Sequence, residues 1–173
     1  PARALVIQMA RFGDLLQTRR LVRSLQAQGS EVHLAVDQSL AGLAKLAFPG
    51  VVAHGLPAHQ AGSLDAAAFL AAARPVLDEL ARTGFDQVHN LNFSGMNFAL
   101  AALFDPALVR GYRMEQGQPR MDLWNRLVFR WTRHRRFAGL NVMDLWGLTA
   151  DAPLPPGEVN PVARPRGGGI GVV

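Results

Sequence analysis

The sequence predicts an α/β domain built on a doubly wound, Rossmann-like parallel sheet. The first observation is segment 4–9, which is nearly continuous in apolar residues. Such a run is typical of a strand that is buried on both faces, as the strands of parallel sheets are. The second observation is that apolar runs of this kind alternate with segments of helical periodicity along the chain. This alternation requires crossover connections, which bring each strand back parallel to the one before it.

Four more strands and six helices are predicted in the rest of the chain. Gly29 and Gly84 are typical of helix ends, and Ser39 and Ser94 are typical of helix starts. The predicted strands are 31–36, 51–56, 86–91 and 108–112. The predicted helices run from Asp14 to Gly29 and over 39–46, 64–82, 94–103, 120–137 and 142–148.

Composition excludes several classes of protein. The chain has 173 residues, enough for one domain with a sizeable core. No apolar run approaches the roughly 20 residues of a membrane span, so an integral membrane protein is not expected. The chain contains no cysteine, which excludes disulfides, thiolate metal sites and cysteine nucleophiles. Its five histidines are scattered without metal-ligand spacing, and no metal site is expected.

The composition changes after residue 150. Segment 151–169 is rich in proline and glycine and is predicted to be a linker that follows a domain over 1–150. Residues 170–173 have the apolar character of another strand. We therefore expect a second domain to begin there.

The loop 10–14 after the first strand is the first candidate for chemistry. In a doubly wound fold the ligand crevice lies beyond the carboxyl ends of the strands, so Asp14 is a candidate general base for a bound hydroxyl. Asp14 is equally a candidate helix cap, because Gln17 follows three residues later as in a capping box. Gly13 is expected to allow a close approach of the backbone or a positive φ. The loop is neither GxGxxG nor a P-loop, so nucleotide binding is not expected there.

The segment 90–95, at the carboxyl end of the fourth strand, is the second candidate. Asn92 and Ser94 carry small polar side chains that suit hydrogen bonds to sugar hydroxyls. The alternative is that they form only a turn and a helix cap.

The third candidate is a basic segment between Arg110 and Arg136, which holds eight arginines and only two carboxylates. On the predicted helix, Trp124 and Trp131 fall on one face with apolar neighbours, and arginines lie on the flanks and back. This pattern fits docking on an anionic membrane surface. It also fits a core-packing helix with a solvated face. Nucleic-acid binding is not expected, because no nucleic-acid motif accompanies the charge.

Four segments taken in order resemble the N-terminal domain of glycosyltransferase family 9, the ADP-heptose:lipopolysaccharide heptosyltransferases. They are LVIQMARFGDLLQTRRLVRSL, EVHLAVDQSLAGL, FDQVHNLNFSGMNFALAAL and VRGYR, and the resemblance covers roughly residues 3–150. One departure is Thr18-Arg19-Arg20, where family members often carry Thr-x-Pro.

The resemblance implies the N-terminal half of a GT-B glycosyltransferase involved in lipopolysaccharide biosynthesis. It implies that Asp14 is the catalytic base of an inverting, metal-independent transfer of heptose or a related sugar. Arg11 and Gly13 match the same motif. Basic residues of the family domain engage phosphorylated inner-core sugars. We therefore expect the acceptor, a phosphorylated glycolipid or glycan, to contact Arg11, Gly13, Asn92, Ser94, Arg113 and Arg120.

The donor, an ADP-sugar, is expected in a C-terminal domain that would follow residue 173, and no other cofactor is expected. The chain alone is therefore expected to be inactive. The expected location is the cytoplasm, with peripheral contact to the inner membrane. The alternative function is a non-catalytic module that docks on anionic membrane or glycolipid through the arginine-rich helix.

Overall fold

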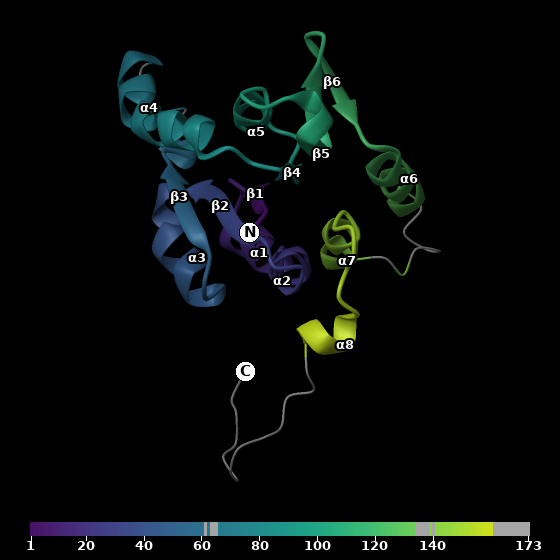
Figure 1. Ribbon diagram of the computed structural model, residues 1–173. Coiled ribbons are helices and arrows are strands. Elements are labelled where there is room, and N and C mark those ends of the chain that lie inside the picture. The colour runs from purple at the N-terminus through teal and green to yellow at the C-terminus, as the bar shows by residue number, and fades with distance from the viewer. Residues whose placement is uncertain (61, 63–65, 134–138, 140, 161–173) are drawn as a thin grey trace, which may run out of the picture.

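The computed structural model describes residues 1–60, 62, 66–133, 139 and 141–160 (Figure 1). Parts of three expectations lie outside these residues. They are the start of the helix expected at 64, the end of the basic helix with Arg135 and Arg136, and the whole segment 161–173.

The described strands form a six-stranded sheet in the order β3-β2-β1-β4-β5-β6. Strands β1 to β5 are parallel, and β6 is antiparallel to β5. The predicted α/β class and the predominantly parallel sheet are confirmed. The strands are β1 (Arg3–Ile7), β2 (Glu31–Asp37), β3 (Val52–Leu56), β4 (Gln87–Asn90), β5 (Val109–Glu115) and β6 (Gln118–Met121).

Helices connect the parallel strands and continue after β6. The first predicted helix is two helices that meet at Thr18, whose hydroxyl donates to the carbonyl of Leu15 at 2.7 Å. The α-helices are α1 (Phe12–Gln17), α2 (Arg19–Ala27), α3 (Ala41–Ala47), α4 (Ala66–Thr83), α5 (Gly95–Ala101), α6 (Leu123–Thr132), α7 (Val142–Gly147) and α8 (Pro156–Val159). Three 3₁₀ turns accompany them, η1 (Gln38–Leu40), η2 (Ala58–Gln60) and η3 (Pro106–Leu108).

The sheet lies between two layers of helices, with an apolar core on each face. Successive side chains of a strand point to opposite faces, so an all-apolar strand contributes to both cores. Ala4 and Val6 of β1 pack with residues of α2, α3 and α7, whereas Leu5 and Ile7 pack with residues of α4 and α5. Figure 1 shows α4 and α5 on one side of the sheet and α2, α3 and α7 on the other.

The hairpin of β5 and β6 differs from the prediction, which placed the start of a helix at residue 120. Gln116 and Gly117 both have positive φ, 53° and 75°. Two consecutive residues of this kind form the tight turn that matches the twist of paired strands. Helix α6 therefore begins only at Leu123. Gly117 was the signal in the sequence that the helical prediction overlooked.

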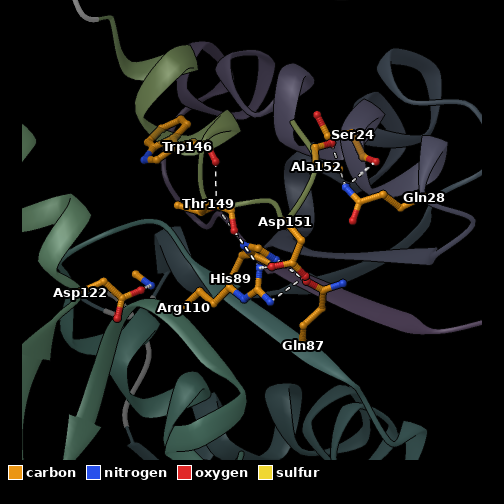
Figure 2. Close-up of polar contacts among 11 residues, drawn as sticks. Ser24, Gln28, Gln87, His89, Arg110, Asp122, Trp146, Thr149, Asp151 and Ala152 are labelled. Carbon is orange, nitrogen blue, oxygen red and sulfur yellow. Dashed lines mark hydrogen bonds and ion pairs between the residues drawn. The ribbon is translucent and has the colours of Figure 1, made fainter. Parts of the chain in front are cut away.

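The segment that follows α7 is fixed to the sheet by a polar cluster (Figure 2). Arg110 of β5 donates to the carbonyl of Thr149 at 3.0 Å and forms an ion pair with Asp151 at 2.8 Å. Nδ1 of the fully buried His89 lies 3.0 Å from the hydroxyl of Thr149, and its Nε2 lies 3.1 Å from the side-chain amide of Gln87. Burial, together with the positive charge of Arg110, lowers the pKa of His89 to about 3, although Asp151 acts in the opposite direction.

The same segment also contacts α2. Arg20, a buried side chain of α2, pairs with Asp144 at 2.7 Å and donates to the carbonyl of Leu154 at 2.8 Å. The hydroxyl of Ser24 accepts from the backbone N–H of Leu154 at 2.9 Å. The described residues 151–154 of the expected linker are therefore held against the domain.

Replacing Arg20 by Ala is expected to lower the free energy of unfolding by about 3 kcal/mol. The change leaves the Asp144 carboxylate, which is largely buried, without its cation, and breaking such a pair from one side is costly. Urea unfolding followed by the fluorescence of buried Trp146 measures the change. The matched control is Arg74→Ala, whose exposed pair with Asp78 should contribute less than about 0.5 kcal/mol. Equal losses of unfolding free energy in Arg20→Ala and Arg74→Ala would contradict a stabilising role for the Arg20–Asp144 pair.

Candidate functional site

The sheet order creates a topological switch point between β1 and β4. The chain passes from β1 through β2 to β3 in one direction, and then continues on the other side of β1 with β4 and β5. The connections after β1 and β4 therefore leave the carboxyl edge of the sheet on opposite faces, and in open α/β sheets a crevice forms between two such connections. Ligands of open α/β sheets bind at such points.

A hydrogen bond joins the two loops that the sequence singled out. The side-chain amide of Asn92, just after β4, donates to Oε1 of Gln8, just after β1. The same oxygen accepts from the backbone N–H of Ala10 at 3.3 Å. Gln8 is fully buried, and its Nε2 has no partner among the described residues. An unpartnered buried donor is costly, and this one lies beneath the junction of the two loops.

Asp14 lies in the first turn of α1, at its third residue. The sequence pattern with Gln17 suggested that Asp14 is the capping residue just before the helix. Because α1 begins at Phe12, Arg11 holds that position and Asp14 lies inside the first turn. Its Oδ2 instead accepts from the backbone N–H of Arg11 at 3.3 Å. Asp14 therefore does help to cap the helix, from its third position and not from the residue before it. This hydrogen bond uses only one of the two carboxylate oxygens. The side chain is half-buried at the switch point.

The neighbours of Asp14 in the loop are open to solvent. Arg11 is exposed, and its guanidinium forms no ion pair with a described residue. Gly13 does not have a positive φ, so that expected reason for glycine is wrong here. Apart from its chain neighbours and the backbone of its own helix, no described atom lies within 4 Å of a Cβ built on Gly13. The space beside Gly13 remains free for a ligand.

Ser94 caps helix α5. Its hydroxyl accepts from the backbone N–H of Asn97 at 3.2 Å and donates to the side-chain oxygen of Asn97 at 3.0 Å. Asn97 also bonds to the buried Asn90, whose amide donates to the carbonyl of Tyr112 at 2.9 Å. These amides fix the loop after β4 on β5. The alternative that Ser94 forms only a helix cap accounts for these contacts. Asn92, in contrast, contacts Gln8 at the start of the loop after β1.

Asp37 and His59, which the sequence did not single out, support the first loop from the other side. The carboxylate of Asp37, at the end of β2, accepts from the backbone N–H of His59 at 2.7 Å, and its Oδ1 lies 3.4 Å from Nδ1 of His59. Nε2 of His59 lies 3.2 Å from the carbonyl oxygens of both Met9 and Ala10. The histidine thus bridges β2 to the loop that carries Asp14.

The charge of Asp37 is well stabilised. Burial acts to raise the pKa of the Asp37 carboxyl, but hydrogen bonds from Ser39 and from the backbone of His59 outweigh it, so the pKa lies below its usual value. Among these contacts, the Ser39 backbone N–H donates at 2.9 Å. A buried, ionised Asp37 therefore holds His59 in place at neutral pH. The sequence pattern does not predict the contact of Asp37 with His59. Asp37 ends β2, whereas His59 follows β3, and only the folded sheet brings the two together.

The two expected arginines of β5 and β6 lie apart from this junction. Arg113 pairs with Asp122 and, at 3.5 Å, with Glu115. Arg120 is exposed on the neighbouring strand, opposite Arg113 in the register. A hollow of about 410 Å³ lies along β5, and none of its lining residues belongs to the two loops. It is lined by Pro106, Ala107, Val109, Arg110, Arg113, Glu115 and Asp122.

Gly111 lies on β5 between Arg110 and Arg113, two residues that line this hollow. Gly111 has a φ of 88°, and a Cβ at this position would collide with the carbonyl oxygen of Asn90. Its backbone N–H donates to Oδ2 of Asp122 at 2.6 Å. Here glycine is required both by the conformation and by the close approach of β4.

Over the described ranges, no three histidine or acidic side chains gather closely enough to bind a metal ion. No helix in that part of the chain combines the length and apolarity that a membrane span needs. No protein-family model, curated protein sequence or solved structure matches the chain. The function is therefore argued from the site itself.

Proposed function

We propose that this chain is the acceptor-binding domain of a GT-B glycosyltransferase similar to the lipopolysaccharide heptosyltransferases. The proposed reaction transfers a heptose or a related sugar from an ADP-sugar to a phosphorylated glycan or glycolipid, with inversion and without a metal. The donor would bind in a second domain that follows this chain, and the two domains would close on the crevice at the switch point.

The observation that carries the proposal is the hydrogen bond from Asn92 to Gln8. It joins the loop after β4 to Gln8, whose side-chain oxygen also accepts from Ala10 at the start of the loop 10–14, so two motifs about 80 residues apart in the sequence are connected. The half-buried carboxylate of Asp14 and the small polar side chain of Asn92 are thus carried by two loops that meet at the switch point, which supports the proposal. Sugar transfer uses hydrogen-bonding groups that hold the acceptor and a base that takes the proton of its hydroxyl.

The proposed step uses Asp14 as the base. The Oδ1 of Asp14 makes no hydrogen bond to a described residue, because the capping bond from Arg11 uses Oδ2. Asp14 takes the proton of an acceptor hydroxyl as the hydroxyl oxygen attacks the anomeric carbon of the donor. The bond from that carbon to the diphosphate oxygen breaks, and ADP leaves with the bonding electrons. Exposed Arg11, and Arg113 and Arg120 further along the sheet, would attract a phosphorylated acceptor.

The test is acceptor-dependent release of nucleotide by the full-length polypeptide that contains this chain. ADP-heptose and other ADP-sugars are supplied with delipidated, phosphorylated inner-core oligosaccharide, and GDP-, UDP- and CMP-sugars serve as controls. We expect ADP release that requires the oligosaccharide. Absence of acceptor-dependent release from all donors, in a protein shown to be folded, would overturn the proposal.

A further inference from the structure

Helix α6 is anchored to the domain by one face only. Val128 and Asn125 are buried, and the indole N–H of Trp124 donates to the carbonyl of Leu145 at 2.9 Å. At 100° per residue, these three side chains occupy one side of the helix. The opposite side faces solvent.

The solvent-facing side combines cations with large apolar side chains. Arg126, Arg130 and Arg133 are exposed, and none of them forms an ion pair with the part of the chain that the structure describes. This contrasts with Arg110 and Arg113, which have carboxylate partners. We call the exposed surface of α6 the α6 basic face. It consists of Leu123, Arg126, Phe129, Arg130 and Arg133, together with Trp131, which lies at its edge beside Trp124.

The apolar members of the α6 basic face are exposed to an unusual degree. Leu123 is 62% exposed, Trp131 49% and Phe129 46%. The prediction that Trp131 and Trp124 fall on one face of the helix is confirmed, but Trp131 is not buried there. Trp131 meets Trp124 only edge to face, at a ring-centroid distance of 6.5 Å. Clustered exposed apolar side chains mark an interaction surface.

A row of aromatic rings connects the α6 basic face with the candidate site. Phe129 packs against Tyr112 at 6.1 Å, and Tyr112 packs against Phe93 at 5.7 Å. Phe93 is 67% exposed and directly follows Asn92, the residue that joins the two loops. The surface and the crevice are therefore neighbours on the molecule.

We propose that the α6 basic face docks this protein on an anionic phospholipid bilayer. The arginines would lie among the lipid phosphates, and Trp131 and Leu123 would enter the interfacial region, where amphipathic rings and leucine are favoured. Exposed cations beside apolar side chains are complementary to such a surface. This inference stands independently of the proposed sugar transfer. If both hold, docking brings the crevice to a lipid-anchored acceptor.

The test uses the full chain with vesicles of 30% phosphatidylglycerol in phosphatidylcholine, and vesicles of pure phosphatidylcholine. We expect sedimentation with the anionic vesicles only, accompanied by a blue shift of tryptophan emission that Trp131→Phe abolishes and Trp146→Phe retains. The triple variant R126Q/R130Q/R133Q is expected to bind on the order of 100-fold more weakly, since each arginine near an anionic surface contributes about fivefold. Raising the salt concentration to 0.5 M should release most of the protein.

The matched control is R23Q/R74Q/R82Q, which removes the same net charge from exposed positions on α2 and α4. Thermal melting should show that both triple variants fold, because all six side chains are exposed. An equal loss of binding in the control would overturn the proposal, as would equal binding to both kinds of vesicle. Binding to single-stranded RNA, lost in R126Q/R130Q/R133Q and accompanied by no vesicle binding, would assign the face to nucleic acid instead. Neither vesicle result depends on a sugar donor, so failure here leaves the transfer proposal standing.

Discussion

Asp14→Asn is expected to lower kcat of the full-length protein by about 10²- to 10⁴-fold, the usual contribution of a general base. The amide of asparagine keeps an oxygen that accepts the backbone N–H of Arg11, so the start of α1 should be retained. The amide nitrogen has no affinity for the acceptor proton at neutral pH. Initial rates of ADP release, measured beside a urea unfolding curve of the same protein, separate catalysis from stability.

Two further variants complete this experiment. Asp14→Ala removes both the base and the capping oxygen, and should also lower the free energy of unfolding by about 1 kcal/mol. Asp78→Asn changes an exposed carboxylate of α4 and should leave kcat unchanged. Wild-type turnover in Asp14→Asn would leave Asp14 with the helix cap as its sole role.

Acidification from pH 7.5 to 5.0 is expected to lower the free energy of unfolding by about 2 kcal/mol through His89 alone. The unfolded chain binds a proton on this histidine near pH 6.5, whereas the folded chain resists protonation down to about pH 3. The stability is therefore fully present above pH 6.5 and is lost as the pH falls through this window. Burial also lowers the pKa values of His33 and His54, which act in the same direction.

His89→Gln isolates this contribution. Glutamine carries no titratable group and retains a donor for the hydroxyl of Thr149. The variant is expected to lose about 2 kcal/mol less stability than the wild type over the same pH interval, whatever its stability at pH 7.5. Urea unfolding at the two pH values gives both numbers. If the wild type and His89→Gln lose the same free energy of unfolding between the two pH values, groups other than His89 cause the acid sensitivity.

The parallel strands were predictable because their signal is local. Segment 4–9 contains an uninterrupted apolar run, and this pattern follows directly from burial on both faces. The hairpin after β5 was missed because Arg120 and Met121 also fit the helical periodicity that begins at Leu123. Only the positive φ values of the turn at Gln116 and Gly117 show that these two residues belong to a strand and not to the helix.

The candidate site was predictable in part. The sequence identified Asp14 and Asn92 from their positions after strands, and strand order then brings their loops together. The contacts of Asp37 with His59 were not predictable, because they join residues from two crossovers. The sequence left the exposure of Trp131 open, because periodicity gives the direction of a side chain but not whether other residues cover it.

Gly111 has a consequence for where charge is presented on this protein. In a regular strand, residues three apart project to opposite sides, so Arg110 and Arg113 would belong to different surfaces. The left-handed backbone at Gly111 interrupts that regular order, and both arginines line the same hollow. A residue without charge or side chain thus stands between two cations that one surface presents together.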